Sequence, residues 1–67
     1  MLSTDNQRIS DIFKRLAEIA AKTSELTRNP NLSPAQKQAA CDSYFREHDQ
    51  ITTEALKIFK KNTKNPL

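Results

Sequence analysis

The fold is decided by the short segment Arg28-Asn29-Pro30-Asn31-Leu32-Ser33-Pro34-Ala35-Gln36, which separates two long helix-compatible stretches. Asn29 precedes a proline, which disfavours the helical region, and asparagine tolerates a left-handed cap, so the first helix should end there. Ser33 can cap the next helix, Pro34 loses no bonded N–H at its first position, and Gln36 completes a capping box. Because the connection is so short, the two helices are expected to lie antiparallel.

The boundaries of both helices follow from similar signals. Thr4 and Gln7 have the spacing of a capping box, so we expect the first helix to begin near Thr4 and to occupy about residues 5–28. The turn is predicted at 29–33, the second helix at about 34–61, and a basic tail at 62–67. The chain has no glycine, which the tight turns of a β-rich fold would need. We therefore predict one all-α domain, an antiparallel two-helix hairpin spanning residues 1–67.

A chain of 67 residues has a small core and usually needs an additional source of stability. Cys41 is the only cysteine and His48 the only histidine, so an intrachain disulfide is excluded and a zinc site within one chain is not expected. Without glycine, a phosphate-binding glycine loop is excluded too, and no cofactor is expected. Association with a second copy or with another protein is the remaining source of stability.

Apolar residues recur at alternating spacings of three and four, the a and d positions of a heptad repeat. This pattern predicts a hairpin core of Ile9, Ile12, Leu16, Ile19, Leu26, Cys41, Tyr44, His48, Ile51, Ala55 and Ile58, together with Thr23. One register pairs all six layers: Ile9 with Ile58, Ile12 with Ala55, Leu16 with Ile51, Ile19 with His48, Thr23 with Tyr44, and Leu26 with Cys41. Large residues then often meet small ones, as a packed core prefers.

The two flanks of this core differ in chemistry. One flank has charged g positions, and the same register predicts that Arg15 meets Glu54 and Lys22 meets Glu47. The opposite flank has uncharged e positions, so we predict an association face there, formed by Phe13, Ala20, Phe45, Thr52 and Phe59. An apolar face this wide suits a bundle, and a second hairpin or a partner's helix is its expected cover. The alternative is that the rings fold over the edge of their own hairpin.

Two residues in the predicted core have side chains that could do chemistry. His48 is interpreted as a structural, hydrogen-bonded histidine; the alternative is a proton switch or ligand within a dimer core. Its burial would make association pH-sensitive, because charging an interior imidazole is costly. Cys41 is interpreted as a small core residue, since His48 lies two helical turns away, about 10 Å, too far to act as its base. No site for a small-molecule substrate is evident, and no enzymatic activity is predicted.

The end of the second helix is basic, with Lys57, Lys60, Lys61 and Lys64 and no acidic residue. These lysines could contact nucleic acid or an acidic partner. The alternative is that they complement the dipole of the helix C-terminus and keep the tail in water.

The N-terminal sequence Met1-Leu2-Ser3-Thr4 is not followed by an apolar run, and charged residues interrupt the most apolar stretch. Neither a signal peptide nor a membrane span is predicted, and membrane association is not expected. With a single free thiol, a cytoplasmic location is expected.

In its second helix the chain resembles the Rop family of plasmid RNA-binding proteins. The similar residues are Cys41-Asp42-Ser43, Asp49, Leu56 and Phe59, and the length, short turn and interior cysteine are similar as well. The resemblance implies an antiparallel dimer of hairpins that binds RNA through a polar and aromatic face of the first helix. Phe13 lies near the phenylalanine of that face, but the asparagine, glutamine and lysine that accompany it in the family have no counterpart here.

Three functions therefore compete. The first is a small regulatory or adaptor protein that acts by helix–helix association, either forming a homodimeric four-helix bundle or sequestering a helix of a partner. The second is an RNA- or DNA-binding regulator of the Rop type. The third is a helical chaperone or subunit of a secretion system that is stable only with its partner.

Overall fold

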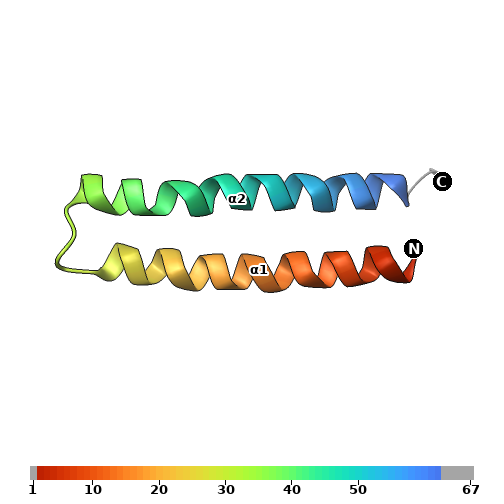
Figure 1. The fold of residues 1–67 in the computed structure, drawn as a ribbon, viewed down its shortest axis with the longest axis horizontal. Helices are drawn as coiled ribbons and strands as arrows, with labels where there is room; N and C mark the ends of the chain where they lie inside the picture. Colours follow the sequence, from red (N-terminus) through yellow and green to blue (C-terminus); the bar gives the residue numbers. More distant parts are fainter. Residues whose placement is uncertain (1, 63–67) are drawn as a thin grey trace.

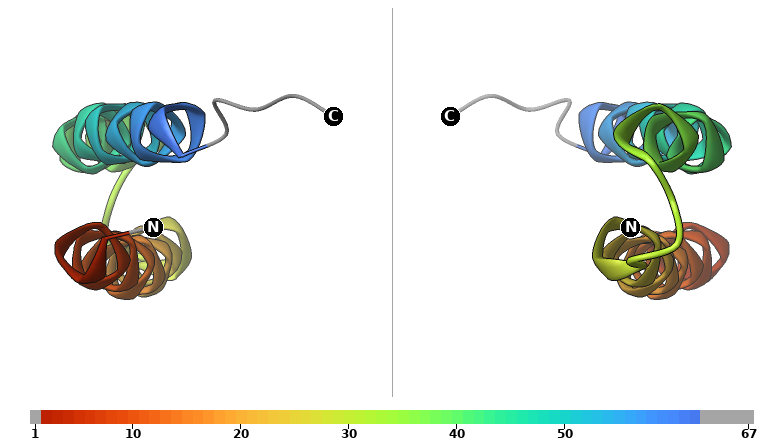
Figure 2. Two further views of the ribbon diagram at one scale, coloured as in Figure 1. Left: turned by 90° about the vertical axis from the view of Figure 1, so that its right-hand side faces the viewer. Right: turned by 90° about the vertical axis from the view of Figure 1, so that its left-hand side faces the viewer.

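The computed structural model describes residues 2–62 and consists, over that range, of two helices and their connection. Helix α1 spans Ser3–Arg28 and helix α2 spans Pro34–Lys61. They lie side by side and antiparallel (Figures 1 and 2). The start of α1 and the end of α2 lie at one end of the hairpin, and the connection lies at the other. The all-α hairpin predicted from the sequence is confirmed. We call the end opposite the connection the open end.

The connection between the helices is stabilised by the residues from which it was predicted. The amide of Gln36 donates to Ser33 Oγ at 3.1 Å, and the amide of Ser33 donates to Gln36 Oε1 at 2.8 Å, so the capping box is complete. Asn29 ends α1 in an extended conformation (φ −70°, ψ 114°), which corrects the expected left-handed cap. The proline that follows is sufficient reason for the extended backbone. The side chain of Asn29 also accepts from the amide of Asn31 at 2.9 Å, which tightens the turn.

The start of α1 differs from the prediction. The helix begins at Ser3 with Leu2 as its N-cap, and no side chain caps it. The prediction of a capping box at Thr4 and Gln7 is therefore wrong. Gln7 Nε2 instead donates to Asp11 Oδ1 at 2.9 Å, one turn further along the helix. A helix that starts one residue before Thr4 places that hydroxyl inside the first turn, where it no longer precedes the unpaired amides.

The core is thin and runs along the line where the helices meet. Ile12, Ile19, Cys41 and Ala55 are buried. The other predicted apolar core positions are half-buried, namely Ile9, Leu16, Leu26, Tyr44, Ile51 and Ile58. His48 is a correction, because its side chain is 51% exposed and lies at the edge of the core. A two-helix layer has no third element over it, so a large polar ring at an a position can turn outward into solvent.

The register of the helices also differs from the prediction. Arg8 pairs with Glu54 and Arg15 with Glu47, whereas Arg15 with Glu54 and Lys22 with Glu47 were predicted. Relative to the prediction, both arginine–glutamate pairs are displaced by one heptad along the chain. The predicted register required α2 to begin about 7 Å beyond the end of α1, a displacement that the direct connection at 29–33 does not make.

Candidate association surface

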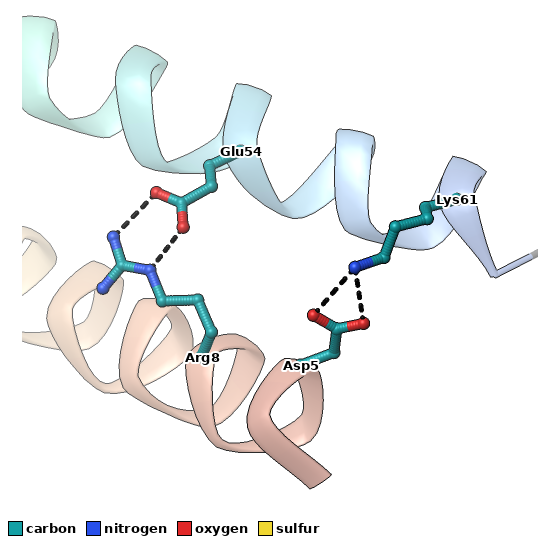
Figure 3. A network of polar contacts seen from close by, with 4 residues as sticks. All are labelled: Asp5, Arg8, Glu54 and Lys61. Carbon is teal, nitrogen blue, oxygen red and sulfur yellow. Dashed lines mark hydrogen bonds and ion pairs between the residues drawn. The ribbon is translucent and has the colours of Figure 1, made fainter. Parts of the chain in front are cut away.

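Three ion pairs between the helices line one flank of the hairpin, which we call the closed flank. Arg15 Nε and Nη2 donate to the two carboxylate oxygens of Glu47 at 2.6 and 2.8 Å. Arg8 makes the same two-point contact with Glu54, and its Nη2 lies 2.7 Å from Oε1 (Figure 3). At the open end Lys61 Nζ lies 2.9 Å from Asp5 Oδ2. The guanidinium fork matches a carboxylate in two places, so these contacts fix the register.

The ion pairs also set the ionisation of the three carboxylates. Hydrogen bonds from Arg15 and from Arg8 lower the pKa of Glu47 and of Glu54, respectively. The hydrogen bond from Lys61 is the largest cause of the lowered pKa of Asp5, and the amide of Asn62 contributes as well. All three are therefore charged at neutral pH, and the closed flank presents paired charges.

Towards the connection the closed flank has no further arginine–glutamate pair. Lys22 lies 3.9 Å from Glu25 on its own helix, while the corresponding position of α2 is Ala40. The cross-helix ion pairs thus occupy the half of the hairpin between its middle and the open end.

The opposite flank carries exposed apolar side chains, and we call it the open flank. Phe13 is 55% exposed, Phe45 53% and Phe59 40%. Ala20 is also exposed, whereas Thr52 is half-buried and its hydroxyl donates to the carbonyl of His48 at 2.7 Å. Each ring is therefore partly covered by its own hairpin and leaves about half of its surface in water.

Leu56 belongs to this surface and was missed as an association residue. It is 58% exposed, and it follows Thr52 by four residues and precedes Phe59 by three, so it lies on the same side of α2. The spacing could have revealed it, but only the e positions were considered. Leu2 is a further large exposed side chain, 65% exposed, at the start of α1.

Near the middle of the open flank the surface forms a hollow of about 390 Å³. Its lining consists of Leu16, Ile19, Ala20, Thr23, Phe45 and His48. Ala20 is the small residue among larger neighbours, so the surface dips between the two helices there. The imidazole of His48 lies at this hollow, with Nδ1 3.6 Å from Asp49 Oδ1. Its surroundings are therefore apolar on one side and acidic on the other.

The remaining residues singled out from the sequence do not converge. Cys41 is a buried free thiol. Within residues 2–62 no three histidine, cysteine, aspartate or glutamate side chains gather as a metal site would require. In the same range neither helix has a stretch long and apolar enough to cross a membrane.

The predicted basic cluster is only partly described by the structure. Lys57, Lys60 and Lys61 are exposed at the end of α2, and Lys64 lies outside the described residues. Because Lys61 is paired with Asp5, this cluster presents less positive charge than its sequence suggests.

Comparison with known proteins does not add a relationship: no protein-family model, no curated protein and no solved structure matches this chain.

Proposed function

We propose that this protein is non-enzymatic and acts through helix–helix association, with two copies joined by their open flanks into a four-helix bundle. The single observation that carries the proposal is the contrast between the flanks. On the closed flank, Arg15 and Arg8 have their charges satisfied within the chain. On the open flank, Phe13 and Phe45 expose about half of their surface. Several large exposed apolar side chains on one flank of a small protein favour an interaction site there.

The total surface of the hairpin supports the same proposal. Its accessible surface is 5274 Å². Folded monomers of 7.7 kDa expose about 4300 Å², so the hairpin has an excess of about 900 Å². One partner in a stable interface of standard size covers about 800 Å². An elongated hairpin exposes more surface than a compact monomer, and the area that a second copy would cover is of the same size as this excess.

Such a protein fits a small regulatory or adaptor role, because it would act by burying the apolar side chains of its open flank against another helical surface. The runner-up uses the same surface: an amphipathic helix of another protein could lie along the open flank and complete a three-helix bundle. The second copy is preferred because it brings an identical apolar face of matching length and needs no further component.

Sedimentation equilibrium of the wild type beside Phe13→Glu and Phe59→Glu tests the proposal. A dimer is expected for the wild type at micromolar concentration, and a monomer for both variants, because each places a charge in the apolar interface. Gln50→Glu is the matched control, since residue 50 is an exposed position on the outer side of α2. A wild type that stays monomeric yet unfolds cooperatively refutes the homodimer and leaves the partner helix to be tested.

A further inference from the structure

The hollow near the middle of the open flank is lined mainly by apolar groups. Its volume of about 390 Å³ lies in the lower part of the range of small-molecule pockets, roughly 300–1,000 Å³. The hydroxyl of Thr23 donates to the carbonyl of Ile19 at 2.9 Å, so it is satisfied within its own helix. Among residues 2–62 no buried side-chain nitrogen or oxygen lacks a hydrogen-bond partner. The hollow therefore suits an apolar group that makes no hydrogen bonds.

Small side chains on α1 leave this hollow open. Ala20 is exposed and lines it, whereas the opposite wall contains the ring of Phe45. Ala17 is exposed too and precedes Ala20 by three residues, so it lies on the same side of α1. At this level α1 therefore presents only methyl groups to a helix lying over it, and packed interfaces place large side chains opposite small ones.

A second copy with its connection at the same end brings a phenylalanine to the hollow. The two-fold axis then runs along the hairpins, so every residue keeps its own level, and α2 of one copy lies over α1 of the other. Phe45 lies at the level of the hollow, because it forms one of its walls. The Phe45 ring of the second copy therefore lies over Ala20.

A second copy with its connection at the other end brings a different phenylalanine to the same place. In that arrangement α1 lies over α1, and levels along the helix are reversed about its centre. The centre of α1, which spans Ser3–Arg28, falls between residues 15 and 16. By helical rise, Phe13 lies about 4 Å on one side of this centre and Ala20 about 7 Å on the other. The reversal therefore brings Phe13 of the second copy within about 3 Å of the level of Ala20.

We propose that the hollow at Ala20 is the central pocket of the homodimer and receives a phenylalanine ring of the second copy, Phe45 or Phe13 according to the direction of that copy. This proposal rests on the proposed function and identifies the contact at the centre of the interface. Both rings leave more than half of their surface uncovered in the hairpin, 53% for Phe45 and 55% for Phe13. Aromatic side chains in well-packed central pockets contribute most of the binding energy of many interfaces, and the two-fold symmetry provides this contact twice.

Filling the hollow tests the inference by sedimentation equilibrium. Ala20→Leu places a larger side chain where the ring would lie, and overpacking is expected to raise the dissociation constant of the dimer at least about tenfold. Ala21→Leu is the matched control: it adds the same atoms at an exposed position on the outer side of α1 and should change the constant less than about threefold. An unchanged or lower constant for Ala20→Leu would overturn the inference, because added methyl groups strengthen an interface whose hollow is empty.

Removing the ring should relieve the effect of filling the hollow. Phe45→Ala leaves space for the larger side chain if the two copies lie in the same direction, and Phe13→Ala does so if they lie in opposite directions. Adding Ala20→Leu to the variant that lacks the inserted ring should then raise the dissociation constant less than about threefold. If Ala20→Leu weakens the dimer as much in both backgrounds as in the wild type, neither ring occupies the hollow and the inference is wrong.

A second measurement uses the unsubstituted chain, because Phe45 also lines the hollow of its own copy and its truncation changes both. In a dimer of one isotope-labelled and one unlabelled copy, filtered nuclear magnetic resonance should detect a nuclear Overhauser effect between the Ala20 methyl group of one copy and phenylalanine ring protons of the other. A dimer without this effect would contradict the pocket and leave the proposed function standing. A chain that is monomeric at every concentration would instead refute the proposed function itself, so the two failures are distinguishable.

Discussion

Truncation of Phe13 offers a direct energetic measurement of the open flank. The ring is 55% exposed in the hairpin. A phenylalanine offers about 200 Å² in all, so about 110 Å² of Phe13 is available for burial by a partner. At about 25 cal/mol per Å², covering this area contributes up to about 2.7 kcal/mol, or about 5 kcal/mol for the two copies in a dimer.

Phe13→Ala is therefore expected to weaken the dimer by about 10²- to 10³-fold, if part of that area is covered. The monomeric hairpin should lose less stability than the dimer, because only the smaller, covered part of the ring packs within the hairpin itself. The dissociation constant is measured by sedimentation equilibrium, and helicity by circular dichroism on the same samples. Phe45→Ala, with a similar exposed fraction, should have a similar effect, and Phe59→Ala a smaller one, since Phe59 is 40% exposed.

Gln50→Ala, on the outer side of α2, is the control for truncation at an exposed helical position. A change below about threefold in the dimer dissociation constant of Phe13→Ala would refute the assignment of this ring to the interface. A complete loss of helicity at low protein concentration would refute the separate claim that the ring contributes less to the hairpin than to the dimer.

The remaining predictions concern the hairpin. Ile12→Ala should reduce the free energy of unfolding by about 2–5 kcal/mol, measured by urea denaturation, because Ile12 is 1% exposed; Ile12→Val should cost about 0.5–1.5 kcal/mol. Ser33→Ala removes the oxygen that accepts from the amide of residue 36, and the melting temperature should fall by an amount equivalent to about 1 kcal/mol. Stability should be full above the unfolded glutamate pKa of about 4.3 and should decline as pH falls through the lowered pKa values of Glu47 and Glu54. An unfolding curve independent of pH between 5 and 2, or one equally steep in Glu47→Gln/Glu54→Gln, would contradict that assignment.

Local features could be predicted from the sequence because they depend on neighbouring residues. The cap formed by Ser33 and Gln36 involves two residues three positions apart, and the structure has both of its hydrogen bonds. The cap at Thr4 used the same pattern and was wrong, because the pattern does not fix where a frayed first turn begins. Pro34 fixes the start of α2, because a proline is tolerated in the first turn of a helix but not in its interior. No proline stands near Thr4, so the start of α1 is not fixed in the same way.

The register could not be predicted from the heptad pattern alone. A heptad repeat looks the same after a shift of seven residues, so it leaves several alignments that all place apolar residues inside. The predicted alignment was chosen for its six matched layers and left Arg8 without an acidic partner. The observed one gives Arg8 to Glu54 and Arg15 to Glu47, and the length of the connection selects it. In this hairpin the length of the connection restricts the register, which the apolar heptad pattern alone does not.

A third ion pair joins the helices at the open end. Asp5 lies at the end of α2, where its side chain is only 13% exposed and pairs with Lys61. The predicted register, which opposed Ile9 to Ile58, also placed Asp5 near residue 62, but no partner was predicted for this carboxylate because it stands at a position expected to be apolar. One lysine of the basic end of α2 is neutralised by this contact. Asp5→Asn removes it and should lower the free energy of unfolding, measured by urea denaturation, more at low salt than at high salt, because salt screens an exposed ion pair.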